Sequence, residues 1–543
     1  MNKRTKLISL IVIVVIAFVL RFIYLDKNPP ALSWDETAQG YNAYALGQTG
    51  TDEFGRSWPL NYLESFGDFK PVLNTYLTIL PVKVFGLTEF ATRFPSAFFG
   101  SLTVLLCFYL VIELFYRRQE KDILGLATAF ILAVSPWHLL LSRGAYEANI
   151  GLFLVVLGGL FLLKGFHGHK LYFLGSVIPF ALTFYTFNST RAFIPFFLLA
   201  VFILYRQFIF SHLKLFLLFC LFFIVLLIPI IPHLLSPQAN LRFREVNIFS
   251  NLKPIEQSNN WIKYDNNSLV AKIVHNRRVI FGLDYLTHYF DHFDLNYLFI
   301  HGDVNSKFSI QDTGQIYLIN LPLFLIGLIV IFRKYRPESL LLFLWLLTGI
   351  IPAATARETP HALRTLQTLP VWHIIIAVGG YYLYSLNLKP FFKKLMVSLY
   401  CLYLLFNIGS FLHNYFYHYP EEFAGSFQYG YHESMSHILT NYQNYDQFLI
   451  TEGLGRPYIY VLFYSRYLPN EFLKTADIQR DVFGFVKVKS FAKYLFGSPP
   501  VIANIKDKKI LVIALPGEVP PGKKIKKIIK NPRGDEALVI YEN

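Results

Sequence analysis

The sequence predicts a polytopic all-α membrane domain of about eleven transmembrane helices, followed by a small C-terminal α/β domain. Hydrophobic residues make up 54% of the 543 residues and charged residues 16%, whereas soluble domains average roughly 25% charged residues. Apolar stretches long enough to span a bilayer recur along the chain. A soluble protein of this composition would expose a large apolar surface, so a membrane protein is expected.

The predicted membrane domain covers residues 1–411. Its apolar runs lie near residues 7–25, 92–116, 123–140, 149–163, 171–187, 192–205, 215–232, 316–332, 339–353, 366–385 and 394–411. The first run follows Met-Asn-Lys-Arg-Thr-Lys and is similar to a signal peptide, but no A-x-A-like cleavage site follows. We therefore expect a retained first span. Two long polar loops, 26–90 and 233–315, interrupt the runs.

Basic residues predict the orientation. If the N-terminus is cytoplasmic, every short basic cluster falls on the cytoplasmic side, as the positive-inside rule requires. The clusters are Lys3, Arg4 and Lys6; Arg117, Arg118 and Lys121; Lys164 and Lys170; Arg206 and Lys214; Arg333, Lys334 and Arg336; and Lys389, Lys393 and Lys394. Both long loops are then extracytoplasmic, and the plasma (inner) membrane is the expected location. These clusters also explain much of the net charge of +15, so no nucleic-acid partner is expected.

Residues 412–543 form the predicted extracytoplasmic accessory domain. Strand-like runs at 448–451, 510–514 and 537–541 and a helix-like run at 457–467 indicate a small α/β fold. The basic run at 523–530 is expected to be a solvated face. No catalytic or phosphate-cradling motif occurs in this region, so a lid or an acceptor-binding accessory is the default expectation.

The most informative polar motif follows the first apolar run. Ser33 and Glu36 fit an S-x-x-E capping box, which predicts a helix start at the membrane surface. A carboxylate held there, that of Asp35, would suit a general base that takes a proton from a hydroxyl nucleophile. The alternative is that Asp35 and Glu36 only favour the positive end of the helix.

Lys70 is a candidate for phosphate binding. It precedes Pro71, so extended backbone is expected, and its ammonium could neutralise the phosphate of a lipid-linked substrate. An ordinary interfacial lysine is the alternative. Asp52 and Glu53 lie in a Gly-rich stretch, where we expect a turn.

Two short outer connectors supply further candidates. Arg143 and Glu147 are four residues apart, so a helix would stack them as a structural ion pair. Alternatively, Arg143 could bind phosphate and Glu147 could hold an acceptor or orient a cation. His361 and Arg364 open the tenth apolar run, where the planar fork of Arg364 and free N–H groups suit phosphate oxygens. Interfacial anchoring is the alternative there.

Other chemistries lack their motifs. No P-loop, GxGxxG, HExxH or GxSxG sequence occurs, which argues against ATP-driven and zinc-hydrolytic reactions. Cys107, Cys220 and Cys401 all lie in apolar runs, so neither a disulfide framework nor a metal site is expected from them.

Several of these motifs resemble those of the GT-C superfamily of membrane glycosyltransferases. Within it, the protein O-mannosyltransferases and the bacterial lipid A aminoarabinose transferases are the most similar groups. The pair Asp35-Glu36 resembles the acidic motif of the first loop, whose Asp is the proposed base. Lys70-Pro71, followed by Tyr76-Leu77, resembles the K-P-P-L-x-Y-W motif, whose Lys meets the donor phosphate, although Val72 replaces the second proline.

Three other segments extend the resemblance. The run from Arg93 to Gly100 resembles the R-x-P-S-x-x-x-G packing signature of the second span. Glu147 falls where the family carries a second acidic residue, usually Asp in the lipid-modifying branch. His361-Ala362-Leu363-Arg364 resembles a motif of the bacterial branch.

The resemblance implies a GT-C fold and a transferase that moves a hexose or pentose, with inversion, from a polyprenyl-phosphate donor. The acceptor would be a protein, lipid or glycan on the extracytoplasmic face, and membrane lipids would surround the enzyme. The expected catalytic residues are Asp35 and Glu36; the expected phosphate-binding residues are Lys70, Arg364 and Arg143; the expected acceptor-positioning residues are Glu147 and His361.

Two alternatives and one open point accompany this hypothesis. A surface-polysaccharide polymerase or ligase would process longer lipid-linked glycans. A lipid-linked sugar transporter would usually place ionisable groups near the bilayer midplane, where this sequence has few. No cofactor is predicted, although Asp35, Glu36 and Glu147 could converge on a divalent metal.

Overall fold

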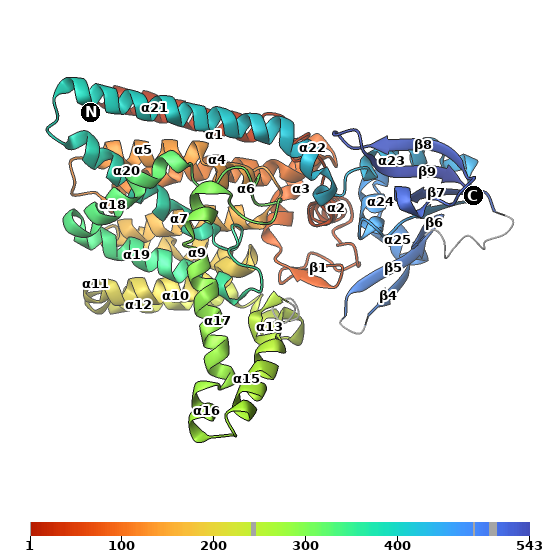
Figure 1. Ribbon diagram of the computed structural model, residues 1–543, viewed down its shortest axis with the longest axis horizontal. Helices are drawn as coiled ribbons and strands as arrows, with labels where there is room; N and C mark the ends of the chain where they lie inside the picture. Colours follow the sequence, from red (N-terminus) through yellow and green to blue (C-terminus); the bar gives the residue numbers. More distant parts are fainter. Residues whose placement is uncertain (1, 241–245, 482–483, 499–507) are drawn as a thin grey trace. The chain divides into compact units, whose positions relative to one another are not determined.

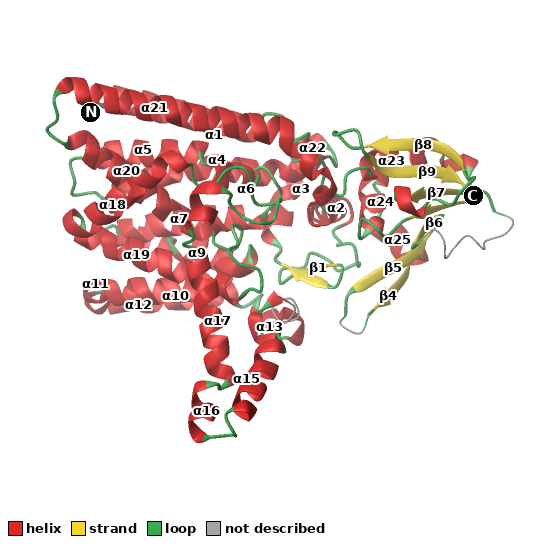
Figure 2. Ribbon diagram, in the orientation of Figure 1, coloured by secondary structure: helices red, strands yellow, loops and turns green. Residues whose placement is uncertain are grey.

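The computed structural model describes residues 2–240, 246–481, 484–498 and 508–543. The described chain is mostly helical, and its named strands lie in a short hairpin and a C-terminal sheet (Figure 2). Residue contacts divide the chain into two compact units. Unit 1 comprises Met1–Phe18, Gly100–Leu141 and Ala148–Ile408, and unit 2 comprises Val19–Phe99, Ser142–Glu147 and Gly409–Asn543. The division predicted at residue 411 separates membrane from soluble parts and stays a prediction.

Most helices of unit 1 lie in its long central segment. They are α8 (Lys170–Gly175), α9 (Val177–Leu182), α10 (Asn188–Leu204), α11 (Arg206–Ser211), α12 (Leu213–Leu227), α13 (Ile231–Leu234), α15 (Lys253–Tyr264), α16 (Leu269–Val274), α17 (Arg277–Asp291), α18 (Leu321–Lys334), α19 (Arg336–Ile350) and α20 (Leu369–Ser385). Helices α5 (Lys121–Val134) and α6 (Pro136–Leu141) precede them. Four helices begin or end in the other unit: α1 (Lys3–Phe22), α4 (Glu89–Leu114), α7 (Glu147–Phe166) and α21 (Pro390–His413).

The chain is a multi-pass membrane protein. In the described part, six helices are long and apolar enough to cross a membrane: Lys3–Phe22, Glu89–Leu114, Glu147–Phe166, Arg336–Thr355, Leu366–Ser385 and Pro390–Phe427. Shorter apolar helices occupy Lys170–Tyr185, Asn188–Leu204 and Leu213–Leu227. Each predicted apolar run falls on a helix or on a broken helix, and the count of eleven crossings stays a prediction.

Helices α18 and α20 show how the bundle of unit 1 packs. A Cβ atom on Gly327 would lie 1.9 Å from the carbonyl oxygen of Ile375, and one on Gly379 would lie 1.9 Å from that of Leu323. Neither position can accept a side chain. Glycine therefore lets these two backbones touch, which is the usual way that membrane helices gain packing contacts.

Unit 1 also carries a helical arm, defined here as residues 253–291 with helices α15, α16 and α17. In Figure 1 the arm runs crosswise to the long helices α10, α12 and α19 of the same unit. Helix α15 packs against α17, and α17 packs against the 3-10 turn Ala353–Thr355. The arm is a helical part of the long polar loop predicted at 233–315.

Unit 2 combines most of the long loop predicted at 26–90 with the C-terminal region. Its helices are α2 (Trp34–Thr49), α3 (Leu73–Phe85), α22 (Tyr419–Phe423), α23 (Tyr431–Thr440), α24 (Pro457–Ser465) and α25 (Pro469–Thr475). Its strands are β1 (Leu63–Ser65), β2 (Asp68–Lys70), β3 (Gln447–Ile450), β4 (Asp477–Arg480), β5 (Val486–Phe491), β6 (Tyr494–Phe496), β7 (Ile510–Ala514), β8 (Lys524–Lys530) and β9 (Glu536–Glu542).

The C-terminal sheet confirms the predicted α/β character. Among the described residues the strand order is β4-β5-β6-β3-β7-β9-β8, and β3 runs parallel to both β6 and β7 while the other pairs are antiparallel. The predicted strands correspond to β3, β7 and β9, and the predicted helix corresponds to α24. The basic run forms the edge strand β8, most of whose residues are exposed.

One apolar core joins the sheet to helix α2 of the first long loop. Phe448 and Ile450 of β3 and Tyr458 of α24 belong to the same buried cluster as Ala38 and Tyr41 of α2. Burial of aromatic side chains dominates the energetics of such a core. The helix that carries Asp35 is therefore held by the C-terminal region.

Candidate active site

Helix α2 begins where the capping motif predicts. The backbone N–H of Ser33 donates to Glu36 Oε2 over 2.9 Å, and the Ser33 hydroxyl accepts from the N–H of Glu36, so both halves of the capping box are present. The helix starts at Trp34 and places Asp35 in its first turn. The carboxylate is favoured there by the positive end of the helix.

Asp35 and Lys70 are brought together by the fold. The ammonium of Lys70 contacts the carboxylate of Asp35, whose side chain is 59% exposed, while the side chain of Lys70 is 20% exposed. Burial by itself would lower the pKa of Lys70, but the carboxylates of Asp35, Asp68 and Glu147 outweigh burial and raise that pKa above its usual value. The lysine is thus a fixed positive charge beside an accessible carboxylate.

A tight hairpin positions Lys70. Strands β1 and β2 pair in register Ser65 with Asp68, and the two turn residues, Phe66 and Gly67, have φ angles of +64° and +83°. Two positive φ angles define a hairpin turn of the type that matches strand twist. Lys70 ends β2, which confirms the extended backbone expected before Pro71.

The C-terminal region holds this hairpin. The backbone N–H of Val486 in β5 donates to the carbonyl of Phe66 over 3.0 Å. A Cβ atom on Gly67 would lie 2.4 Å from the carbonyl oxygen of Gly484, so only glycine allows this close approach. The guanidinium of Arg456 lies 4.3 Å from the ring centroid of Phe66. None of these contacts is visible in the motif that carries Lys70.

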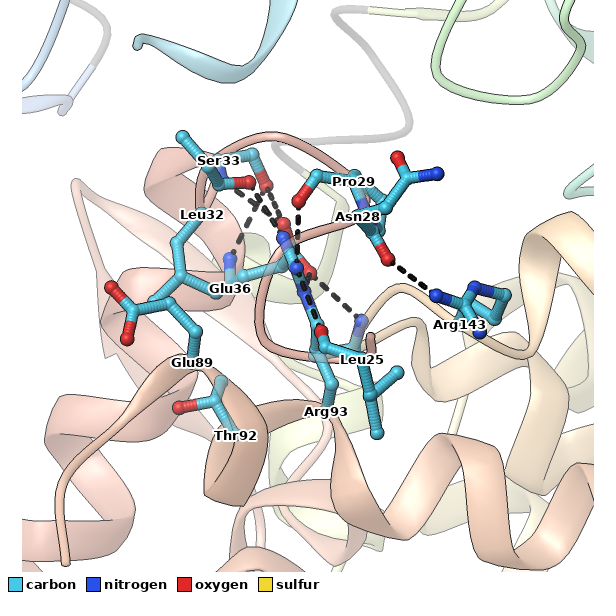
Figure 3. A network of polar contacts seen from close by, with 12 residues as sticks. Leu25, Asn28, Pro29, Leu32, Ser33, Glu36, Glu89, Thr92, Arg93 and Arg143 are labelled. Carbon is cyan, nitrogen blue, oxygen red and sulfur yellow. Dashed lines mark hydrogen bonds and ion pairs between the residues drawn. The ribbon is translucent and has the colours of Figure 1, made fainter. Parts of the chain in front are cut away.

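Glu36 forms a buried ion pair with Arg93 (Figure 3). Arg93 Nε lies 3.0 Å from Glu36 Oε1, and the other Arg93 nitrogens donate to the carbonyl oxygens of Leu25, Pro29 and Ala31. The N–H of Ala145 also donates to Glu36, over 3.0 Å. Both charged side chains are at most 2% exposed. The pair therefore ties the first loop to α4 and to the connector that precedes α7.

The protonation state of Glu36 follows from these contacts. Burial alone would raise the pKa of Glu36. The charge of Arg93 and the hydrogen bonds from Arg93, Ser33 and Ala145 outweigh burial, so the pKa lies below its usual value. Glu36 is an ionised, inaccessible carboxylate, and this geometry suits a positioning residue better than the catalytic residue expected from the sequence.

Arg143 has a complete set of hydrogen-bond partners within unit 2. Nε donates to the hydroxyl of Tyr415. The terminal nitrogens donate to four backbone carbonyls, those of Leu20, Arg21, Tyr24 and Asn28, and Figure 3 shows the bond to Asn28. Since a guanidinium has five N–H groups, all are engaged. Arg143 is fully buried and supports the chain after α1, and its part in phosphate binding stays a prediction from the sequence.

Glu53 is a site feature that the sequence did not reveal. The expected turn is present, because the N–H of Gly55 donates to the carbonyl of Asp52. The Glu53 carboxyl is fully buried and accepts from Asn42 Nδ2 over 2.8 Å and from the hydroxyl of Tyr458 over 3.0 Å. Burial raises the pKa of Glu53 to about 8. Glu53 therefore carries a proton at neutral pH.

His361 and Arg364 belong to unit 1. They lie in a turn, and α20 begins only at Leu369, so the expected helix start is displaced by more than one turn. The N–H of His361 donates to His292 Nε2 over 3.2 Å, and the N–H of Ala362 donates to Asp303 Oδ2 over 2.7 Å. Burial raises the pKa of Asp303 to about 6. Asp303 supports the motif and was not among the expected residues.

Possible metal ligands are dispersed in the described structure. No group of three or more His, Cys, Asp or Glu side chains gathers there in an arrangement that could hold a metal ion. Glu36 is engaged by Arg93, and Asp35 is in contact with Lys70.

Solved structures show the fold class. This chain has the fold of the GT-C membrane glycosyltransferases, which confirms the resemblance. It is similar to the crystal structure of ArnT from Cupriavidus metallidurans bound to undecaprenyl phosphate, with a TM-score of 0.54, 11% identity and coverage of 98% of this chain and 97% of that chain. The apo ArnT structure gives a TM-score of 0.53 and 12% identity, covering 100% and 98%.

A second similar structure belongs to a larger protein. The archaeal oligosaccharyltransferase AglB from Archaeoglobus fulgidus, in complex with an inhibitory peptide and a dolichol-phosphate, has a TM-score of 0.52 and 11% identity. The match covers 86% of this chain and 64% of that chain. Neither the protein-family models nor the curated proteins match this sequence.

Proposed function

We propose that this chain is a membrane glycosyltransferase that moves a hexose or pentose from a polyprenyl-phosphate donor to an acceptor outside the cytoplasm. The contact between Asp35 and Lys70 carries the proposal, because it sets an accessible carboxylate beside a fixed positive charge. The fold supports it, since the similar ArnT and AglB structures hold undecaprenyl phosphate and dolichol-phosphate respectively.

The proposed reaction divides the work between these two side chains. Lys70 binds the phosphate and neutralises the charge that grows as the bond between the anomeric carbon and the phosphate oxygen breaks. Asp35 takes the proton of the acceptor hydroxyl while its oxygen bonds to the anomeric carbon from the opposite face, with inversion. Before the substrates bind, the two groups neutralise each other. The arriving phosphate gives Lys70 a new anionic partner, which leaves the Asp35 carboxylate for the acceptor.

The other residues take supporting parts in the proposal. Glu36 and Arg93 fix the start of α2 and so the direction of Asp35. Glu147 lies near enough to Lys70 to affect its pKa, which suits a role in holding the acceptor. Arg364 at the donor phosphate and His361 at the acceptor stay predictions from the sequence, as does the extracytoplasmic position of the loops.

Substitution of Asp35 tests the proposal. Transfer of labelled sugar from a polyprenyl-phosphate donor is measured in membranes that carry wild type, Asp35→Asn or Asp35→Glu. Loss of the base lowers the rate by about 10²–10⁴-fold in Asp35→Asn, and the carboxylate of Asp35→Glu restores part of it. An undiminished rate in Asp35→Asn removes Asp35 from the mechanism.

The same assay separates the alternatives. A polymerase or ligase gives products longer than one added sugar from a single purified donor. A transporter moves labelled lipid across liposome membranes and makes no glycosylated product. Either result replaces the transferase proposal.

A further inference from the structure

The arm of unit 1 lies against the end of a membrane-spanning helix. The hydroxyl of Tyr289 in α17 donates to the carbonyl of Leu347 over 2.9 Å, and that of Tyr285 donates to the carbonyl of Ile351 over 3.2 Å. Both carbonyls lie within the candidate span Arg336–Thr355. Leu347 is about 12 Å before the end of that span at 1.5 Å per residue. Helix α17 therefore lies alongside the last turns of this candidate span, within about 12 Å of its end.

The free face of α17 is apolar. Val279, Leu283, Leu286 and Phe290 are spaced by four, three and four residues, so they form one stripe, and each is between 42% and 63% exposed. The short helix α16 adds Leu269 and Ile273, which are 78% and 71% exposed. A continuous apolar surface of this kind is unfavourable in water and normal in contact with lipid.

Helix α15 and the tip of the arm carry polar and basic side chains beside the exposed rings of Trp261 and Tyr264. Helix α15 exposes Glu256, Gln257, Asn259 and Asn260. Around the tip, residues 263–278 carry four basic side chains, Lys263, Lys272, Arg277 and Arg278, and one acidic side chain, Asp265, which is paired with His275. A basic rim on an apolar helix is the usual complement of anionic lipid headgroups.

An open groove of about 400 Å³ lies on this arm. It is lined by Phe249, Arg278, Phe281, Gly282 and Tyr285. The rings of Phe249 and Phe281 are 5.9 Å apart, and a Cβ atom on Gly282 would meet no atom within 4 Å. The walls thus suit a hydrocarbon chain, and the guanidinium of Arg278 suits a phosphate.

We propose that this groove binds one anionic phospholipid of the surrounding bilayer, with an acyl chain along Phe249, Phe281 and Gly282 and the phosphate on Arg278. Tyr285 is shared between the groove and the contact with Ile351, so the bound lipid braces the arm against the span. This site is separate from Asp35 and Lys70 and does not depend on the proposed transfer reaction.

Two variants and one matched control test the site. Gly282→Leu fills the groove, where space is available and where leucine is a better helix former than glycine. Arg278→Gln removes the charge and keeps the groove. Arg277→Gln removes the neighbouring exposed charge, which does not line the groove, and serves as the control.

Native mass spectrometry of the purified full-length chain measures retained phosphatidylglycerol and phosphatidylcholine. Wild type and Arg277→Gln are expected to retain one phosphatidylglycerol with about tenfold preference over phosphatidylcholine, because the choline cation of phosphatidylcholine offsets the attraction of its phosphate to Arg278 and one charged contact is worth about that factor. Arg278→Gln should lose the preference, and Gly282→Leu should lose the bound lipid while unfolding at the wild-type temperature.

Equal lipid retention by all four proteins would show only general lipid around the spans and would overturn the proposal. A phosphatidylglycerol preference that survives in Arg278→Gln would overturn it as well, whether or not Gly282→Leu folds. Undecaprenyl phosphate added in near-stoichiometric amounts is a further probe. If it displaces phosphatidylglycerol from wild type but not from Gly282→Leu, the groove is assigned to the lipid-linked donor instead.

Discussion

At the scale of single residues, Glu53 shows how burial changes the protonation of a carboxyl group in unit 2. The carboxyl is buried between α2 and α24, and its oxygens accept from three neutral donors, Asn42, Ser65 and Tyr458. Glu36 is equally buried but is ionised by Arg93. The two carboxyls therefore respond to pH in opposite ways, because a neighbouring charge decides the outcome of burial.

Removing the carboxyl of Glu53 should flatten the dependence of stability on pH. The pKa of Glu53 is about 8 in the folded chain and about 4.5 for a solvated glutamate, as in the unfolded chain. At pH values between these two, the folded state therefore binds one more proton than the unfolded state. The free energy of unfolding then falls as pH rises through this interval. We expect the Tm of Glu53→Gln in detergent to decline less between pH 6 and pH 9 than that of wild type.

An exposed carboxyl provides the control for Glu53. Glu536 lies at the surface of unit 2, and Glu536→Gln should follow the wild-type curve. Parallel Tm curves for Glu53→Gln and wild type would show that Glu53 is ionised in the folded state or that it titrates as it does in the unfolded chain.

The sequence predicts single residues well only where their partners are close along the chain. The capping box could be identified because Ser33 and Glu36 are three residues apart. Arg93 is 57 residues from Glu36 and 62 residues from Ala31, so its motif indicated packing but not its partners. The contact between Asp35 and Lys70 spans 35 residues and was expected only through a shared substrate.

At the scale of elements, the β1–β2 hairpin determines where Lys70 lies. Its turn touches the backbone of β5 and of the residues just before it, and its second strand ends at the lysine. A short isolated hairpin has little stability in water. The position of Lys70 therefore depends on a strand that lies more than 400 residues further along the chain.

Gly67→Ala should separate the hairpin from the C-terminal region. A side chain at this φ costs about 1–2 kcal/mol, and its Cβ would also collide with the carbonyl oxygen of Gly484. We expect a lower Tm and a transfer rate that falls because Lys70 is misplaced. Gly517→Ala, at a glycine with no atom within 4 Å of the added Cβ, should leave both unchanged. Equal behaviour of the two variants would mean that the hairpin does not need this contact.

At this scale the sequence predicts secondary structure, but it does not predict which strands pair in the sheet. Apolar runs and strand-like runs located the helices and β3, β7 and β9, because hydrophobic pattern is a local property. The order β4-β5-β6-β3-β7-β9-β8 follows from contacts between distant segments. The arm was expected only as a polar loop, since polar residues interrupt the apolar stripe of α17, which therefore forms no long continuous apolar run.

At the scale of the whole molecule, the orientation in the membrane is the main prediction that substitution of cysteines can check. In a variant lacking Cys107, Cys220 and Cys401, single cysteines at Asn61 and Glu358 should react with a membrane-impermeant maleimide on intact cells. A cysteine at Asn387, on the predicted cytoplasmic side, should react only after lysis, because basic clusters remain inside. Labelling of Asn61 and Glu358 from opposite sides would contradict a common extracytoplasmic site.

The three separate segments of unit 2 limit how this chain can be recombined with another of the same fold. A chimera that receives residues 409–543 from another protein acquires a foreign Val486 and Tyr458 next to its own Phe66 and Glu53. The segments of the other protein that correspond to residues 19–99 and 142–147 must then be transplanted together with its C-terminal segment. The first loop with Asp35 and Lys70 and the C-terminal region that packs against it would thus be inherited as one block, although hundreds of residues separate them in the chain.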